Sequence, residues 1–268
     1  MKIKEKQVKL ILTKSNLPGI DFVVNPYIGC KHSCVYCYAD FMKRFTGHAN
    51  EKWGEFVDIK INAYEKIPLK IPKNAKILMS SVTDPYQPIE AKYEITRKCL
   101  KRLLPLQPNL EILTKSPLIL RDIDLLKQFK NLKIGISIGI FNEKYAKELE
   151  SCVVSPKKRL EVLKKLHKEG ISTYLFVSPI FPEISNQFKI ISVAKNYVNE
   201  IFFENLNIRA NNRERVLNFI KKTKPNLEDL YKSLPKNRIY WDKIEKEIIK
   251  ECKNNKVKYK IFFHHGKD

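Results

Sequence analysis

Short apolar runs alternate with amphipathic segments along most of the chain. Runs rich in Ile, Val, Leu and Phe predict strands, and apolar residues at helical spacing predict helices. The expected strands span residues 20–27, 75–81, 110–116, 132–140, 171–180 and 200–206. The expected helices span residues 34–46, 91–104, 117–129, 155–170 and 186–197, and a further helix at 240–254 precedes a strand at 257–263. Strand and helix alternate about six times, which favours an α/β fold with a parallel sheet or a partial barrel.

Polar side chains follow the expected strands where each strand ends. In parallel α/β folds, the carboxyl ends of the strands carry the chemistry. The polar residues at or near these ends are Cys30, Ser80, Ser81, Thr83, Asp84, Lys115, Ser116, Ser137, Ser178, Glu204 and Asn205. Because such ends meet at one edge of a sheet, we expect the functional site there.

The stretch GCKHSCVYCY, residues 29–38, holds three of the six cysteines of the chain. Cys30, Cys34 and Cys37 have the spacing C-x3-C-x2-C. A structural zinc site usually takes four ligands from two separated pairs, and no second pair follows here, although His32 could be a fourth ligand in a cramped loop. A cubane iron–sulfur cluster on three thiolates fits the spacing better, because it leaves one iron open for another ligand.

The charge of the chain is strongly basic, with 51 Lys and Arg against 29 Asp and Glu and a net charge of +22. A field of this sign attracts polyanions, so nucleic acid is a natural partner. A Lys-rich proteome composition would explain the same charge, since the lysines are spread along the whole chain. The charge alone therefore leaves both explanations open.

Hydropathy and the first residues bear on the compartment. No apolar run is long enough to span a bilayer, and the start MKIKEKQVKL lacks the apolar region of a signal peptide. We therefore expect a soluble cytoplasmic protein without membrane association. In that reducing compartment, clustered cysteines are more often metal ligands or redox groups than disulfides.

The motif C-x3-C-x-aromatic-C, directly after a strand, resembles the signature of the radical S-adenosylmethionine (SAM) superfamily. The resemblance implies a [4Fe-4S] cluster on Cys30, Cys34 and Cys37, with SAM on the open iron. It also implies an external flavodoxin- or ferredoxin-like reductant, whose electron cleaves SAM to methionine and a 5′-deoxyadenosyl radical. The segments similar to the spore photoproduct lyase-like branch are NPYIGCKHSCVYCYA, SSVTDPYQPIE, ILTKSPLILRDIDLL and SPIFPEISN.

The resemblance covers about residues 20–206 and implies a partial (β/α)6 barrel of the radical SAM type. The radical SAM core would span residues 1–206, with a lead-in at 1–19. A short α+β C-terminal extension, residues 207–268, would pack on this core.

The same resemblance implies four SAM contacts near the cysteines and on two strands. Tyr36 holds the aromatic position that the superfamily places beside the SAM adenine. Tyr38 would pack against the cluster or SAM, or else serve as a core residue. Lys115 is in position for the SAM carboxylate, and Ser137 for the ribose or the methionine moiety.

The segment SSVTDP stands where superfamily members carry a Gly-Gly-Glu-like sequence that receives the SAM amino group. Ser81, Thr83 and Asp84 are therefore the candidate acceptors. Asp84 could instead cap the following turn, as Asp often does.

Two features depart from the lyase pattern. Spore photoproduct lyases carry a hydrogen-donating cysteine near the end of the second strand, where this chain has Met79, whose thioether cannot donate that hydrogen. Cys152 is a candidate substitute, although we favour a buried structural role for it. Cys99 and Cys252 fall in helical patterns and are assigned to packing. His32 is expected to face solvent, and His264 and His265 to lie outside the catalysis.

The sequence therefore predicts a radical SAM enzyme of lyase- or transferase-like chemistry that abstracts hydrogen from an unidentified substrate. Nucleic acid is the favoured class, through DNA repair or RNA modification, with Arg209, Arg213 and Arg215 as its local anchors. The alternatives are a non-catalytic iron–sulfur or zinc module that binds nucleic acid, and a radical SAM enzyme that acts on a peptide or small molecule.

Overall fold

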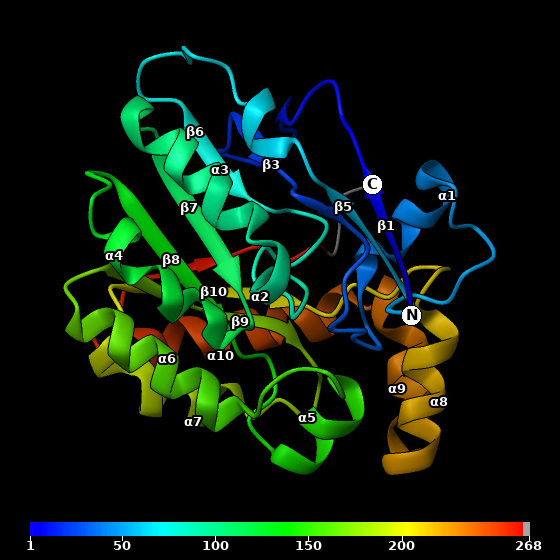
Figure 1. The fold of residues 1–268 in the computed structure, drawn as a ribbon. Coiled ribbons are helices and arrows are strands. Elements are labelled where there is room, and N and C mark those ends of the chain that lie inside the picture. The colour runs from blue at the N-terminus through cyan, green and yellow to red at the C-terminus, as the bar shows by residue number, and fades with distance from the viewer. Residues whose placement is uncertain (265–268) are drawn as a thin grey trace.

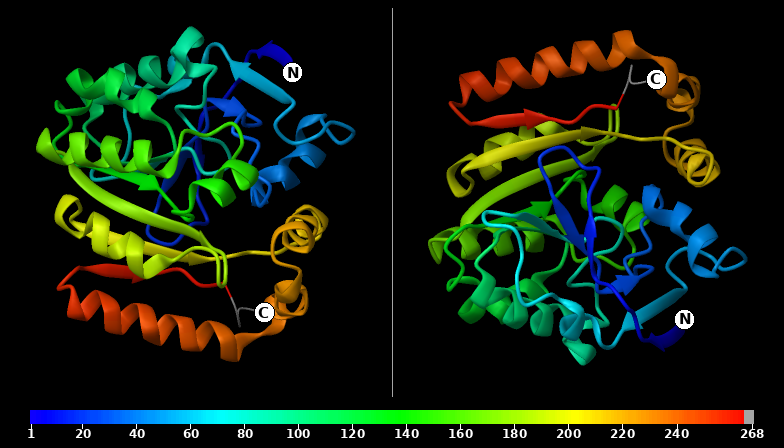
Figure 2. Two further views of the ribbon diagram at one scale, coloured as in Figure 1. Left: turned by 90° about the horizontal axis from the view of Figure 1, so that it is seen from below. Right: turned by 90° about the horizontal axis from the view of Figure 1, so that it is seen from above.

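The computed structural model describes residues 1–264 (Figure 1). The strands of its main sheet are β2 (Leu12–Lys14), β3 (Phe22–Val24), β6 (Lys76–Met79), β7 (Asn109–Thr114), β8 (Leu132–Ser137), β9 (Ser172–Ile180), β10 (Glu200–Asn205) and β11 (Tyr259–Ile261). Within the described residues their order is β11-β10-β9-β8-β7-β6-β3-β2. β2 runs antiparallel to β3, and the other neighbours are parallel. The sheet does not close on itself, so the barrel is partial, as expected (Figure 2).

The helices connect these strands and cover the sheet. They are α1 (Lys43–Thr46), α2 (Glu90–Tyr93), α3 (Ile95–Leu103), α4 (Ile123–Leu126), α5 (Glu143–Leu149), α6 (Pro156–Lys168), α7 (Gln187–Ala194), α8 (Arg213–Thr223), α9 (Glu228–Ser233) and α10 (Arg238–Asn254). Figure 1 shows α3 and α6 packed along the outer side of the strands. Because the parallel strands are covered in this way, most of their residues are buried, as in β6 and β8.

The helix predicted at 155–170 shows how local sequence and burial agree. It forms α6, and the Ser155 hydroxyl accepts a hydrogen bond from the N–H of Lys158 at 3.3 Å, a cap worth about 1 kcal/mol. Leu163 and Leu166 on one face are fully buried. Burial of such a side chain stabilises the fold by about 1.5–3 kcal/mol, so packing holds this helix more than its cap does.

A second, short sheet supports the cysteine region and was not predicted from the sequence. It consists of β1 (Lys2–Lys6), β5 (Phe56–Lys60) and β4 (Tyr27–Ile28). β1 is parallel to β5, and β4 is antiparallel to it. The strand expected at 20–27 is therefore divided between the two sheets, and β4 leads directly into residues 29–38.

The helix expected at 34–46 is largely wrong. Cys34 to Cys37 form an irregular loop, followed by a 3-10 helix at Tyr38–Met42 and the single turn of α1. The apolar spacing of this segment suits a helix, but long-range bonds compete for its backbone. For example, the N–H of Val35 donates to the carbonyl oxygen of Leu149 at 2.9 Å.

The C-terminal extension joins the main fold in two ways. β11 adds to the edge of the main sheet, parallel to β10, and α10 lies alongside β11 (Figure 2). The start of α8 contacts residues 35–40, since Arg215 donates to the carbonyl oxygen of Val35 and is paired with Asp40. No helix among residues 1–264 has the length and apolar character that a bilayer crossing requires.

Candidate functional site

The three cysteines of the cysteine loop, which we define as residues 29–38, are withdrawn from solvent. Cys30 and Cys34 are each only 7% exposed, and Cys37 is half-buried. Burial, with smaller effects of Asp84 and Cys37, raises the pKa of Cys30 to about 12. Burial also raises the pKa of Cys34 and of Cys37, while the cation of Lys115 acts in the opposite direction on both. Buried thiols of this kind become thiolates when a metal centre supplies positive charge.

The cysteine loop fits a cluster better than a single ion. Among residues 1–264, no three His, Cys, Asp or Glu side chains are grouped so that they could hold one metal ion. In a cubane each thiolate binds a different iron, so the three thiols need not converge on one point. The residues present therefore fit a three-thiolate iron–sulfur cluster.

A glycine lets the cysteine loop approach the short sheet. Gly29 has φ 81°, and a Cβ atom there would lie 2.4 Å from the carbonyl oxygen of Phe56. Only glycine combines this left-handed backbone with such a close approach. The position of Cys30, the next residue, depends on it.

The segment SSVTDPYQPIE holds the backbone on both sides of Cys30. Thr83 Oγ1 donates to the carbonyl oxygen of Gly29 at 2.6 Å. The buried side chain of Gln87 donates to the same oxygen at 3.2 Å and accepts from the N–H of Lys31 at 2.8 Å. Sequence reasoning missed Gln87, because nothing local distinguishes it from other loop glutamines.

Asp84 is buried beside the cysteine loop, and both of its carboxylate oxygens accept hydrogen bonds from other residues of the chain. Oδ1 accepts from Thr114 Oγ1 at 2.6 Å and from the N–H of Tyr86 at 2.8 Å. Oδ2 accepts from the N–H of Lys115 at 2.8 Å. Burial alone would raise the pKa of Asp84, but His32 and these hydrogen bonds hold it below its ordinary value. Asp84 thus fixes the turn after β6 and the start of Lys115, and its contact with SAM stays a prediction.

His32 does not face solvent, so that expectation was wrong. It is buried, with Nε2 at 3.1 Å from Asp84 Oδ2 and Nδ1 at 3.4 Å from the carbonyl oxygen of Cys152. The cause is a tight turn at Ser33, which has φ 51° and whose N–H donates to the carbonyl oxygen of Cys30. The turn folds the loop back, so that His32 lies against Asp84.

Three residues that the sequence placed near SAM converge beside the thiols. Lys115 Nζ donates to Ser137 Oγ at 2.8 Å and lies 5.8 Å from the ring centre of Tyr36. Ser137 Oγ in turn donates to the carbonyl oxygen of Ser178 at 3.2 Å. The ends of β7 and β8 therefore bring a cation and a hydroxyl to the cysteine loop.

Tyr36 is anchored by a buried ion pair that sequence reasoning missed. Its hydroxyl donates to Glu150, which is paired with Arg159, and both partners of the pair are fully buried. Arg159 also donates to the carbonyl oxygen of Ser137 at 2.7 Å. A signal for Arg159 was present, because it lies at helical spacing with Leu163 on the buried face of α6.

Tyr38 and Ser81 meet at the more open side of the loop. Tyr38 is 39% exposed, and its hydroxyl donates to the carbonyl oxygen of Ser81. The N–H of Ser81 donates to Asn25 Oδ1 at 2.9 Å. Ser81 and Thr83 are both half-buried, so their side chains border the loop without being sealed beneath it.

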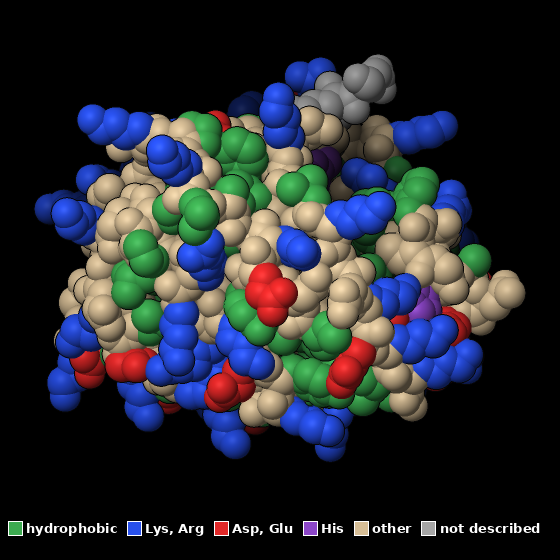
Figure 3. All heavy atoms as spheres, turned by 45° about the horizontal axis from the view of Figure 1, so that its top comes forward, with side chains coloured by type: hydrophobic (Ala, Val, Ile, Leu, Met, Phe, Trp, Pro, Cys, Tyr) green, Lys and Arg blue, Asp and Glu red, His purple; other side chains and the backbone are tan. Residues whose placement is uncertain are grey.

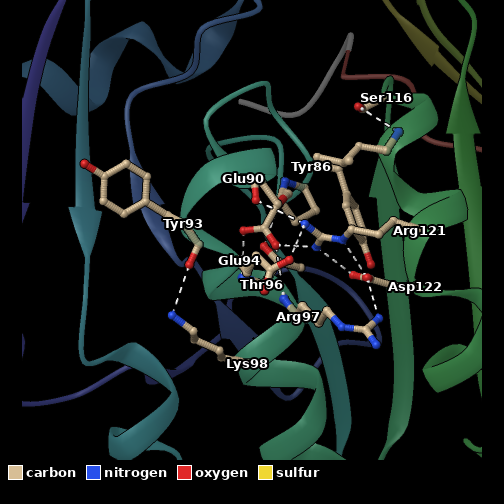
Figure 4. Close-up of polar contacts among 12 residues, drawn as sticks. Tyr86, Glu90, Tyr93, Glu94, Thr96, Arg97, Lys98, Ser116, Arg121 and Asp122 are labelled. Carbon is tan, nitrogen blue, oxygen red and sulfur yellow. Dashed lines mark hydrogen bonds and ion pairs between the residues drawn. The ribbon is translucent and has the colours of Figure 1, made fainter.

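A network of polar side chains supports the segment SSVTDPYQPIE (Figure 4). Glu90 is fully buried, accepts from the hydroxyl of Tyr27 and is paired with Arg121 at 2.7 Å. Arg97 is paired with Asp122 at 2.7 Å. The network joins β4, which leads into the cysteine loop, to the helices that follow β6 and β7.

The remaining cysteines and Met79 are distributed as follows. Met79, Cys99 and Cys252 are fully buried in the core, which agrees with packing roles for the two cysteines. Cys152 is exposed, so the favoured interpretation of a buried structural residue was wrong. It lies in the turn between α5 and α6, outside the core, and its carbonyl oxygen contacts His32.

The ends of β9, β10 and β11 bring together a second polar group. Ser178 Oγ donates to Glu204, and His264 Nε2 lies 2.8 Å from Glu204 Oε1. The N–H of His264 donates to Asn205 Oδ1 at 2.9 Å. His265 lies outside the described residues.

The three arginines expected to bind nucleic acid separate into two groups. Arg209 and Arg213 are exposed. Arg215 is half-buried, donates to the carbonyl oxygen of Val35 at 3.0 Å and is paired with Asp40, and nucleic-acid binding by the three arginines stays a prediction. A buried acceptor within reach explains the difference.

The chain matches one family model and several known proteins. Residues 24–189 match the family model described as the Radical SAM superfamily. An uncharacterized protein of Methanocaldococcus jannaschii is 40% identical over 210 residues, which is 78% of either chain. An uncharacterized protein of Acidianus two-tailed virus is 35% identical over 213 residues, 73% of this chain and 70% of that one.

Among solved structures, the fold is similar to spore photoproduct lyase complexed with dinucleoside spore photoproduct. The TM-score is 0.73 at 14% identity, over 97% of this chain and 82% of that one. At this identity the likeness shows a shared fold. Together with the family match, it leads to one conclusion: the chain belongs to the radical SAM superfamily.

Proposed function

We propose that this protein is a radical SAM enzyme that binds a [4Fe-4S] cluster through Cys30, Cys34 and Cys37 and SAM beside it. Family membership supports the cofactors, and the three withdrawn thiols support the ligand set. The observation that carries the proposal is the convergence of Lys115, Ser137 and Tyr36 next to those thiols. A purely structural metal module has no need for such an arrangement.

The chain's residues would divide the binding of SAM between them. Lys115 Nζ offers a cation for the SAM carboxylate, with Ser137 Oγ holding the ammonium in place. The Tyr36 ring and Tyr38 offer aromatic surface to the adenine or the cluster. Ser81, Thr83 and Asp84 would receive the SAM amino group. For Asp84 this role would act through its hold on the N–H of Lys115.

When bound, the cluster and SAM supply the reductive cleavage typical of the superfamily, with the electron provided by an external flavodoxin- or ferredoxin-like carrier. The protein's part is to orient SAM and to exclude water from the reacting atoms. The buried rings of Tyr36 and Phe181, which meet edge to face at 5.6 Å, supply apolar surface beside the loop. Exclusion of water protects a reactive intermediate from side reactions.

For the substrate we propose a nucleic acid that undergoes a lyase- or transferase-like reaction after loss of a hydrogen atom. The net charge of +22 supports a polyanion. Lys and Arg side chains are scattered widely over the face in Figure 3, with few acidic ones among them. The structure that shares this fold at a TM-score of 0.73 contains a bound dinucleoside, which adds support.

The test begins with anaerobic purification, reconstitution with iron and sulfide, and measurement of both elements and of the absorption spectrum. Reductant and SAM are then added, and 5′-deoxyadenosine is quantified alone and with single-stranded DNA, duplex DNA, RNA, peptides or metabolite pools. Cluster formation and SAM cleavage that rises with a nucleic acid are expected. Zinc in place of iron, or no cleavage, would contradict the enzyme. Stimulation by peptides or metabolites alone would contradict the nucleic-acid substrate.

A further inference from the structure

The start of the C-terminal extension lies against the cysteine loop, far from it in sequence. Three backbone carbonyl oxygens of the loop accept hydrogen bonds from this one segment. They are those of Val35 from Arg215 Nε at 3.0 Å, Tyr36 from Asn212 Nδ2 at 2.9 Å, and Tyr38 from Asn211 Nδ2 at 3.1 Å. The three acceptors flank Cys37 on both sides.

Asn212 is fully buried, and its side-chain amide is completely used. Besides Tyr36, Nδ2 donates to the carbonyl oxygen of Asn207 at 3.0 Å, and Oδ1 accepts from the N–H of Arg209 at 2.9 Å. An amide supplies two donors and an acceptor, whereas a carboxylate supplies acceptors only. The position therefore requires an amide, and its loss would leave the buried carbonyl oxygen of Tyr36 and the partly buried one of Asn207 without this donor.

Arg215 reaches the other side of the same loop. Its Nη1 atom is 2.5 Å from Asp40 Oδ2, while its Nε atom holds Val35. Asp40 is buried and also faces Lys43 Nζ at 3.1 Å. The planar fork of a guanidinium can serve both acceptors at once, which a single ammonium cannot.

The loop has few backbone bonds of its own to fix this geometry. Between Cys34 and Cys37 the chain is neither strand nor helix. The N–H of Cys37 donates to the carbonyl oxygen of Cys34 at 3.1 Å, and that of Val35 donates to Leu149. Side chains from elsewhere must therefore hold the carbonyl groups.

We propose that Asn212 and Arg215 are positioning residues that fix the backbone around Cys37 and so set where its sulfur meets the cluster. Both lie outside residues 24–189, which match the family model. The inference rests on the proposed function, since it assumes a cluster on Cys30, Cys34 and Cys37. It makes the C-terminal extension part of the cluster site.

The test uses the full chain with Asn212→Ala, Arg215→Lys and Arg213→Gln. Arg213 is the matched control, because it lies in the same helix as Arg215 and its side chain is exposed. The first readout is the rate at which a chelator removes iron from the reconstituted protein. The second is hydrogen exchange of the amides of residues 30–38 in the metal-free protein, which needs no cluster. Circular dichroism checks that each variant is folded.

Asn212→Ala and Arg215→Lys should each release iron about tenfold faster than the unaltered protein, as expected for a lost buried hydrogen bond. Their loop amides should also exchange faster, while Arg213→Gln matches the unaltered chain in both readouts. Equal iron release and equal exchange in all variants would overturn the inference. If Asn212→Ala fails to fold, iron release and amide exchange in Arg215→Lys decide the inference. If the unaltered protein holds no iron, the proposed function fails, and amide exchange still decides whether these residues order the loop.

Discussion

Lys115 Nζ donates to Ser137 Oγ at 2.8 Å, although Lys115 follows the end of β7 and Ser137 is the last residue of β8. The bond aims the ammonium group over Tyr36 and toward the cysteine loop. A cation held in this way can receive the SAM carboxylate without losing further side-chain freedom. In the proposed function, SAM affinity therefore depends on Lys115, whose ammonium group Ser137 holds in place.

Lys115→Ala should weaken SAM binding about tenfold to a hundredfold, because hydrogen bonds to charged groups contribute about 1.5–3 kcal/mol. Iron and sulfide content should be unchanged, since Lys115 is not a ligand of the cluster. Equilibrium dialysis with labelled SAM measures the affinity, and Lys127→Ala, an exposed lysine paired with Glu169, is the control. Unchanged affinity would remove Lys115 from the SAM site.

Single substitutions of Cys30, Cys34 or Cys37 by Ala should abolish cluster assembly, because a cubane on two thiolates is poorly held. Cys152→Ala should leave it intact, since this cysteine is exposed and outside the loop. Cys99→Ala should also keep the cluster but lower the stability of the fold, because Cys99 is fully buried. Iron per chain after reconstitution is the measurement, and full occupancy in the three loop variants would refute the ligand assignment.

Gln87→Leu should destabilise the fold by about 1–3 kcal/mol, since it leaves the carbonyl oxygen of Gly29 and the N–H of Lys31 without this partner. Urea unfolding of the metal-free protein measures the loss. Gln128→Leu is the control, because Gln128 is exposed. If both variants lose the same stability, Gln87 has no special hold on the cysteine loop.

Glu150→Gln should lower the free energy of unfolding by about 3–5 kcal/mol, because it leaves Arg159 as an uncompensated buried charge. Burial alone would raise the pKa of Glu150, but Arg159, Lys115 and the Tyr36 hydroxyl hold it below its ordinary value. A lowered folded-state pKa stabilises the fold above the unfolded value of about 4.3, and this contribution is lost as the pH falls through the folded value. The free energy of unfolding, measured from pH 7 into the acid range, should fall in the unaltered chain and fall less in Glu150→Gln. Identical pH profiles would contradict the assignment.

Reversal of Arg209 and Arg213 to Glu should lower the affinity for DNA or RNA and flatten its salt dependence, which is roughly −0.9 in log–log slope per neutralised phosphate on duplex DNA. Arg215 is omitted because it holds the cysteine loop. The control reverses Lys157 and Lys243, which are also exposed but lie elsewhere. Fluorescence anisotropy at several salt concentrations measures both quantities, and equal losses in the two double variants would mean that the attraction is generic.

The strands and part of the site could be predicted from the sequence because their signals are local. Lys115 and Ser137 end apolar runs, and parallel strands bring such ends to one edge. The cysteine spacing identified the loop in the same way. These features need no knowledge of distant residues.

Other parts of the site depend on contacts that no local pattern records. Gln87, Glu150 and Asn212 act on loop residues far away in sequence, and their own surroundings resemble ordinary turns. The prediction of a helix at 34–46 was wrong for the same reason. The N–H of Val35 and the carbonyl oxygens of Val35 and Tyr36 bond to distant residues instead of to helical neighbours. Apolar spacing described which residues are buried there, but not the backbone that buries them.

The long separation between the cysteine loop and its partners bears on when the loop becomes complete during synthesis. Asn212 follows Tyr36 by 176 residues, and Arg215 follows Val35 by 180. At about 5–20 residues per second, a ribosome needs on the order of 10 to 35 s to bridge that gap. Throughout this interval the backbone around Cys37 lacks the side chains of Asn212 and Arg215, so delivery of iron and sulfide should favour the finished chain over the growing one.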